Sequence, residues 1–271
     1  MRSGSEVALA AAKERWNGLR TQISGQEIEL AEAIFSIADI LSENLSVVAA
    51  LEDSSRPAET RARLVTDLFS GKIRGEVLDL LTGLARDRWS ESGDIIRSLE
   101  HLGAYTLLLG AQRDNELSRV EEEIYVSMRT LRHERGLRLT LSDDHYPAAG
   151  RAELAQQIFA SCSPYAQRLI MRAVVHTGRG RTLAQSLTRY LDLAAQLDQH
   201  IVASITSAVP LTRDQEDRLR SILTRTYNKG VAIHVTLDPA VIGGIRIHVG
   251  DDVIDGTLAS RITALRENFT N

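Results

Sequence analysis

The stretch LEDSSRPAETRARLVTDLF, residues 51–69, returns ninety positions later as LSDDHYPAAGRAELAQQIF, residues 141–159. Both copies carry an Asp-x-x-x-Pro pattern, in which the aspartate turns the chain and the proline enters the first turn of a helix. The same register extends without a gap upstream to Glu32 and Glu122. Downstream, SLEHLGAYTLLLGAQ from Ser98 is similar to SLTRYLDLAAQLDQH from Ser186. We therefore predict that the chain contains a duplicated helical module.

Apolar residues recur at spacings of three and four from residue 5 to about residue 200, which predicts amphipathic helices. One such stripe runs from Ile28 to Leu45. Turn-forming residues interrupt the pattern at residues 24–25, 53–57, 71–75, 90–94, 143–147 and 178–180. Helices with short connections are typical of a bundle. We predict a first helical module at residues 1–113 and a second, duplicated one at residues 114–200.

After residue 200 the apolar period changes from about 3.6 to 2. Strands with one apolar and one polar face are predicted at residues 201–208, 231–237, 245–249 and 253–254. Thr212 and Gln215 form a capping-box pattern that begins a helix to about Tyr227. A last amphipathic helix is expected at Thr257–Asn268. The predicted fold class is α+β and mostly α, with two tandem helical-bundle modules followed by a small C-terminal α/β domain at residues 201–271.

The composition is that of a soluble globular protein, with 271 residues, 43% hydrophobic residues and a formal net charge of −4. A mildly acidic chain has no general attraction to nucleic acids or anionic lipids. The longest apolar runs are far shorter than the ~20 residues that a membrane-spanning helix needs. With one cysteine, Cys162, no internal disulfide is possible. We expect a chain that reaches a membrane only through its partners.

Few residues suggest chemistry. His234 and His248 would share one face of two neighbouring strands if those strands pair, but zinc needs at least a third protein ligand, so a solvent-facing polar pair is favoured. Gly243-Gly244 lacks the pattern of a phosphate-binding loop and is better explained by a strained turn or bulge before a strand. Gly178-Arg-Gly-Arg181 is better explained as a loop than as an anion site. An enzyme is disfavoured, and no cofactor or metal is expected.

The C-terminal string LDPAVIGGIRIHVGDDVIDGTLASRITAL, beginning at Leu237, is the most specific signal in the chain. It closely resembles the C-terminal signature of the delta subunit of F-type ATP synthases, the equivalent of the mitochondrial oligomycin-sensitivity-conferring protein. The signature residues are Asp238, Gly243, Gly244, Gly250, Asp255, Gly256 and Arg261. With the upstream stretch SITSAVPLTRDQEDRL from Ser204, the resemblance covers residues 200–271 almost continuously. The helical region resembles the family more loosely and is longer than one bundle by about ninety residues.

The resemblance implies a non-catalytic stator subunit of the peripheral stalk, which holds the catalytic head still while the rotor turns. The expected partners are the N-termini of the alpha subunits, bound by a helical module, and the b subunit, bound by the C-terminal domain. One copy per complex is expected, with no nucleic acid and no direct insertion into a membrane. The expected location is the cytoplasmic face of the cell membrane. The alternative is a helical-repeat adaptor of an unrelated assembly.

A groove for a partner helix requires an exposed apolar strip between two helices. Two stripes are candidates, one on the first predicted helix and one that includes Val77 and Leu81. The residues predicted to bind a partner are Leu9, Trp16, Leu19, Leu80 and Leu84. Trp16 is the favoured anchor, because tryptophan is enriched at binding hot spots. The alternative is that both stripes are simply bundle core. The first module, residues 1–113, is predicted to bind the alpha subunit.

Overall fold

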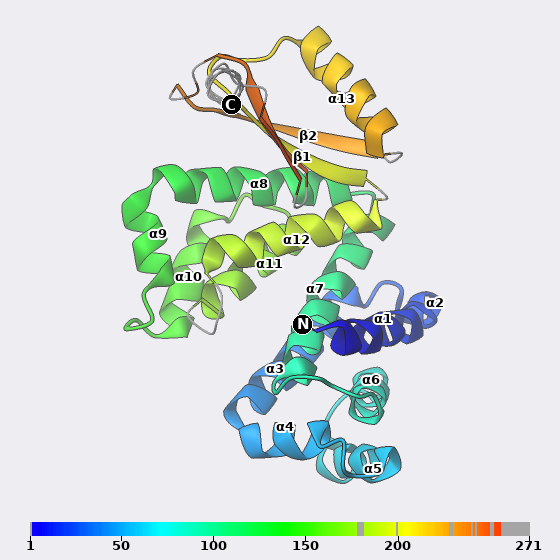
Figure 1. Cartoon of the computed structure of the whole chain (residues 1–271). Coiled ribbons are helices and arrows are strands. Elements are labelled where there is room, and N and C mark those ends of the chain that lie inside the picture. Colours follow the sequence, from blue (N-terminus) through cyan, green and yellow to red (C-terminus); the bar gives the residue numbers. More distant parts are fainter. Residues whose placement is uncertain are drawn as a thin grey trace, which may run out of the picture. The chain divides into compact units, whose positions relative to one another are not determined.

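The computed structural model describes residues 2–177, 182–198, 200–227, 230–239, 241, 243–249 and 252–255 (Figure 1). It is mostly helical, with one small mixed sheet near the C-terminus, and this confirms the predicted α+β fold class. The chain forms two compact units. The first comprises Met1–Val120 and Phe159–Leu169, and the second comprises Glu121–Ile158 and Ile170–Asn271. The three-part division at residues 113 and 200 stays a prediction.

The first compact unit is built on the helices α1 to α7. Their bounds are Ser3–Asn17, Arg20–Ile23, Glu27–Glu43, Leu45–Glu52, Ala58–Phe69, Gly75–Arg86 and Asp94–Arg113. The helices α3 and α7 pack along each other and form its centre. They approach closely because Gly103 on α7 has no side chain: a Cβ atom there would lie 2.7 Å from Cδ1 of Phe35 on α3. Large buried leucines and isoleucines from both helices fill the surrounding core.

Five further helices follow in the order of α3 to α7. They are α8 (Leu117–His133), α9 (Arg135–Ser142), α10 (Ala148–Ile158), α11 (Pro164–Val175) and α12 (Leu183–Leu197). Their lengths are 17, 8, 11, 12 and 15 residues, against 17, 8, 12, 12 and 20 for α3 to α7. The helix order and lengths thus repeat with the sequence.

The repeat extends to individual hydrogen bonds. Arg61 on α5 and Arg151 on α10 are both buried. The Nη1 atom of Arg61 donates to the Leu51 carbonyl at 3.3 Å, and that of Arg151 donates to the Leu141 carbonyl at 3.2 Å. In each copy, therefore, one arginine binds the end of the preceding short helix, where carbonyl groups have no partner within the helix.

The predicted stripe from Ile28 to Leu45 does not lie on one helix. The helix α3 ends at Glu43, and Asn44 leaves helical geometry with a ψ of 62° while its Nδ2 atom donates to the Ile40 carbonyl at 2.7 Å. Leu45 begins α4 and is 66% exposed, so its assignment to the buried stripe was wrong. Within the described ranges no single helix is long and apolar enough to cross a membrane, although α3 and α4, bent by 101°, pass that test together.

The sheet holds β1 (His200–Ser207), β2 (Gly230–Leu237), β3 (Ile245–Val249) and β4 (Asp252–Asp255) in the spatial order β2-β1-β3-β4. The strands β1 and β2 are parallel and are joined by α13 (Arg213–Tyr227), whereas β3 is antiparallel to both β1 and β4. Four predicted strands are thereby confirmed. The helix predicted at Thr257–Asn268 lies outside the described residues.

The helix α13 covers one face of this sheet (Figure 1). Its predicted capping box is present: Gln215 N donates to Thr212 Oγ1, and Thr212 N donates to the Gln215 side chain at 2.8 Å. The apolar strand faces and Leu223 of α13 form a separate small core. The buried members of this core are Ala203, Ile205, Leu223, Val231, Ile247 and Val249.

Candidate partner-binding site

The two predicted apolar stripes lie on adjacent helices except at Leu19, because α1 packs against both α6 and α7 but ends at Asn17. Trp16, Leu80 and Leu84 are buried, with 1%, 6% and 0% of their surfaces exposed, whereas Leu9 and Leu19 are half-buried. Trp16 is held by a hydrogen bond from Nε1 to Thr106 Oγ1 on α7, at 2.8 Å. The structure therefore brings the two stripes together as one seam, which we call the α1/α6 seam. Their role in partner binding stays a prediction.

Part of the exposed side of α1 beside this seam is apolar and made of small residues, next to the exposed Glu14. Val7 is 70% exposed, and Ala10 and Ala11 are exposed as well. Gly83 on α6 has no side chain at the point where α1 passes. A Cβ atom there would lie 3.3 Å from Nε of the Arg15 guanidinium. An ion pair from Arg15 to Asp87, at the end of α6, joins the two helices. Small residues and an exposed valine leave room for a further helix along α1.

The helix α7, which contacts α11 of the second module, is covered where α1 is exposed. In the order of the repeat α11 corresponds to α6, and its Tyr165 lies against α7, where the hydroxyl donates to Asp114 at 2.6 Å. A Cβ atom at Gly110 of α7 would lie 2.7 Å from the Tyr165 ring. The C-terminal end of α7 thus contacts the first turn of α11. Every residue from Leu102 to Ala111 of α7 is buried, so this helix offers no free flank.

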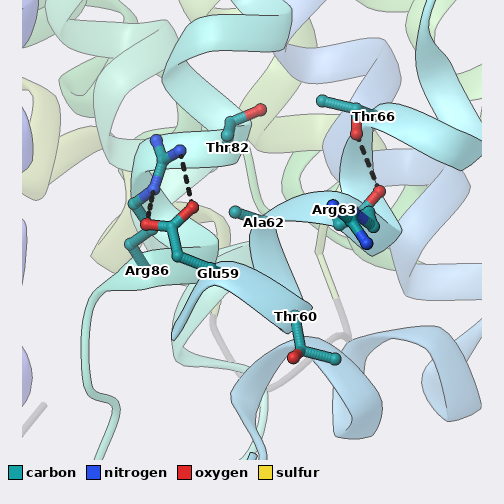
Figure 2. A pocket seen from close by; sticks show the side chains of 7 residues that line it. All are labelled: Glu59, Thr60, Ala62, Arg63, Thr66, Thr82 and Arg86. Atoms are coloured by element: carbon teal, nitrogen blue, oxygen red, sulfur yellow. Dashed lines mark hydrogen bonds and ion pairs between the residues drawn. The ribbon is translucent and has the colours of Figure 1, made fainter. Parts of the chain in front are cut away.

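A polar pocket of about 410 Å³ lies between α5 and α6 (Figure 2). Figure 2 shows Glu59 and Arg86 on one side of it and Arg63 and Thr66 on the other. The Arg86 guanidinium makes two bonds to the Glu59 carboxylate, at 3.0 and 3.2 Å, which hold the pKa of this carboxyl below its usual range. The charges of Arg86 and Glu59 compensate each other, and this ion pair links α5 to α6. The pocket contains none of the predicted site residues.

The two histidines of the C-terminal domain do not lie on neighbouring strands. His234 on β2 and His248 on β3 both lie opposite Ser204 of β1, which runs between them. They are therefore about 10 Å apart along the sheet, two strand spacings, and the condition that their strands pair is not met. The favoured interpretation as a solvent-facing pair was wrong for His234, which is 9% exposed. The parallel β1–α13–β2 connection places β1 at the centre. Among the described residues neither histidine belongs to a cluster of three potential metal ligands.

His234 instead takes part in a contact between the sheet and α8. Its ring stacks on Tyr125 of α8 with the ring centroids 4.3 Å apart, and the Tyr125 hydroxyl lies 2.7 Å from Thr236 Oγ1. Glu122, also on α8, lies 3.9 Å from His234 Nδ1. Burial lowers the pKa of His234, and the Glu122 carboxylate opposes this only in part. Tyr125 takes the position of Phe35 in the ninety-residue repeat, and it was not among the predicted site residues.

This contact predicts a pH dependence of stability. Because the pKa of His234 is lower in the folded protein than in the unfolded chain, the unfolded chain takes up the proton first as the pH falls below about 6.5. We expect the free energy of unfolding to decrease between pH 7.5 and 5.5, and the decrease to be smaller in His234→Gln. Thermal unfolding at both pH values measures it. The exposed His133 supplies the control: if His133→Gln reduces the decrease equally, His234 is not its source.

The glycines of the C-terminal signature form the predicted turn. Gly243 and Gly244 have φ values of 64° and 80°, a left-handed backbone that favours glycine, and they lead directly into β3. Asp238 follows β2, and its backbone N–H donates to the Ser207 carbonyl at 2.9 Å. Asp255 lies in β4 opposite Arg246. Gly250, Gly256 and Arg261 lie outside the described residues, as does the loop at residues 178–181.

The chain is similar in sequence to proteins of known family. Residues 103–269 match the family described as ATP synthase delta (OSCP) subunit. An ATP synthase subunit delta of Beutenbergia cavernae is 36% identical, with 99% of each chain covered. That of Streptomyces griseus is 37% identical, with 97% of each chain covered. A chain of the Toxoplasma gondii mitochondrial ATP synthase hexamer aligns with a TM-score of 0.41 and 16% identity, covering 62% of this chain and 95% of the other.

Proposed function

Because this chain belongs to the ATP synthase delta (OSCP) subunit family, we propose that it joins the alpha-subunit N-termini to the b subunit. The first helical module binds the alpha subunits, and the C-terminal α/β domain binds the b subunit. The chain catalyses no reaction of its own and is present once per complex. It lies at the cytoplasmic face of the cell membrane, attached through the complex.

The chain is a peripheral-stalk subunit of the F-type ATP synthase. Its relatives match it over nearly their whole length, including both helical modules. The ninety-residue repeat is therefore part of a delta subunit, and an adaptor of an unrelated assembly is not favoured. A stator resists the torque of the rotor, which requires rigid links between its parts. The Tyr125–Thr236 hydrogen bond and the Tyr125–His234 stack supply one such link within the second compact unit.

The observation that supports the first module as the alpha-binding one is the difference between α1 and α7. The helix α1 packs against α6, and the C-terminal end of α7 contacts Tyr165 of α11, the helix that corresponds to α6 in the repeat. The helix α1 exposes an apolar flank at Val7, Ala10 and Ala11, whereas α7 is enclosed over Leu102–Ala111. A partner helix gains binding free energy by burying apolar surface, so it requires the open flank.

Two substitutions on this flank test the proposal. In the full-length chain, Val7→Glu combined with Ala11→Glu places two carboxylates where the partner helix would bury apolar surface. We expect the Kd for a synthetic peptide of the alpha-subunit N-terminus to rise at least about tenfold, a loss of about 1.4 kcal/mol. Isothermal titration calorimetry measures the Kd. Both side chains are exposed on α1, so the fold is not expected to change.

Ala49 provides the matched control, since it is exposed on α4, away from the seam. Ala49→Glu is expected to leave the Kd unchanged. Undiminished binding by the double variant would exclude the α1 flank as the alpha site, although the family membership would stand.

A further inference from the structure

One corner of the second module has the opposite charge to its counterpart in the first. Residues 129–138, RTLRHERGLR, join the end of α8 to α9 and contain four arginines and one glutamate. The corresponding residues 39–48, DILSENLSVV, contain two acidic residues and no basic one. In a chain with a net charge of −4, this basic corner is a local feature that the fold alone does not require.

Three of these arginines are free to bind a partner. Arg129, Arg132 and Arg135 are exposed, and none of their guanidinium groups has a hydrogen bond or ion pair with another described residue. The fourth, Arg138, folds back on α8, where its Nη1 atom donates to the Leu131 and Arg132 carbonyls at 3.0 and 3.1 Å. The corner therefore presents guanidinium groups with unused donors.

An apolar pocket opens beside these arginines, between α8, α9 and α12. It has a volume of about 230 Å³. Its lining residues are Met128, Leu131, Arg132, Arg138, Leu183, Ala184 and Leu187. Leu131, Leu183 and Leu187 are buried, whereas Ala184 is exposed at the rim. We call this the α8/α9/α12 pocket.

The repeat explains why the pocket is open. In the first module the position of Arg138 is held by Val48, which is 1% exposed, and α4 packs against both α3 and α7. In the second module the side chain of Arg138 is directed to the end of α8 instead. Val48 thus fills the core of the first module, whereas Arg138 at the same position does not fill the core of the second. The leucines around Arg138 therefore line a cavity.

We propose that the α8/α9/α12 pocket binds an acidic amphipathic segment of another ATP synthase subunit. One apolar side chain of that segment enters the pocket, and carboxylates beside it pair with Arg129, Arg132 and Arg135. Guanidinium groups form strong two-point hydrogen bonds with carboxylates, and the apolar pocket supplies the anchor. This contact rests on membership of the complex. It adds a third attachment to the two under Proposed function and does not depend on their residues.

The shape and chemistry of the site favour a peptide over other anionic partners. The volume is below the ~300–1,000 Å³ that is usual for small-molecule sites. The lining has no aromatic side chain on which a nucleic-acid base could stack. A membrane surface is contacted by protruding apolar side chains, whereas this apolar surface is concave. An apolar side chain between acidic residues matches both parts of the site.

Photo-crosslinking in the assembled complex tests the proposal. A photoreactive amino acid at Ala184 is introduced into the full-length chain in cells that assemble this ATP synthase, and the complex is purified after irradiation. We expect mass spectrometry to identify a crosslink to a segment of another subunit that carries at least two carboxylates around an apolar residue. With Arg129, Arg132 and Arg135 replaced by Glu, the yield is expected to fall at least tenfold.

Arg218→Glu is the matched control, because Arg218 is an exposed arginine on α13 with no partner in the described part of the chain. It is expected to leave the yield unchanged. Four outcomes would each overturn the proposal. They are the absence of a crosslink, a crosslink only to lipid or nucleic acid, a crosslinked segment without acidic residues, and a crosslink yield that the charge reversal does not change. Copurification of the variant chain with the catalytic head is measured on the same samples. It tests the proposed attachment to the alpha subunits independently of the crosslink.

Discussion

Trp16→Ala is expected to destabilise the protein by about 4 kcal/mol, since replacing a buried tryptophan by alanine typically costs about 3–5 kcal/mol. The Trp16 side chain is 1% exposed, and its indole N–H binds Thr106 on α7. The substitution leaves a cavity between α1 and α7 and removes the N–H donor to the Thr106 hydroxyl, which still donates to the Leu102 carbonyl. Urea unfolding followed by circular dichroism measures the shift.

Trp16→Phe separates the two contributions, because it keeps the apolar ring and removes only the indole N–H. We expect a loss of about 1 kcal/mol, the usual net value of one hydrogen bond. If Trp16→Ala changed stability by less than about 1 kcal/mol while abolishing binding of the alpha-subunit peptide, Trp16 would be a binding anchor instead of a core residue.

Arg61→Ala is expected to cost about 3 kcal/mol, because it leaves buried carbonyl groups without a donor. Besides the Leu51 carbonyl, the Arg61 guanidinium binds the carbonyls of Arg86 and Asp87 at the end of α6, at 3.2 and 2.8 Å. A cation there also opposes the partial negative charge at the C-terminus of a helix. The measurement is again the free energy of unfolding in urea.

Arg63 is the matched control for Arg61, because it lies two residues away on α5 and is exposed. Arg63→Ala is expected to change stability by no more than about 0.5 kcal/mol. An equal loss in both variants would mean that charge on α5, and not the buried hydrogen bonds, stabilises the helix ends. Arg151→Ala is expected to resemble Arg61→Ala, since Arg151 binds the Leu141 and Val174 carbonyls at 3.2 and 2.9 Å.

The local features of the fold could be predicted because they depend on near neighbours in the chain. The capping box of Thr212 and Gln215 spans four residues, and the turn at Gly243-Gly244 depends on the conformational freedom of glycine. The repeat was visible because matching residues keep their register over many positions. The break at Asn44 was overlooked, because α4 begins without interrupting the spacing of apolar residues.

The candidate site was only partly predictable. The spacing of apolar residues correctly placed Trp16 and Leu84 on inward faces, but it could not distinguish a core from a groove that another protein fills. The exposed Val7 beside the seam and the pocket lined by Leu187 were not predicted. Both depend on what the neighbouring helices leave uncovered.

By itself, the sequence determined the family, the duplicated helices, the strands and the faces that are buried. These properties follow from residue spacing, turn chemistry and a specific C-terminal signature. Only the tertiary structure decided that β1 separates His234 from His248, that α7 is enclosed while α1 keeps a free flank, and that Arg138 leaves a pocket open. The physical reason is that the spacing of apolar residues indicates which face of a helix or strand is buried. Which other element covers that face depends on contacts between residues far apart in the chain.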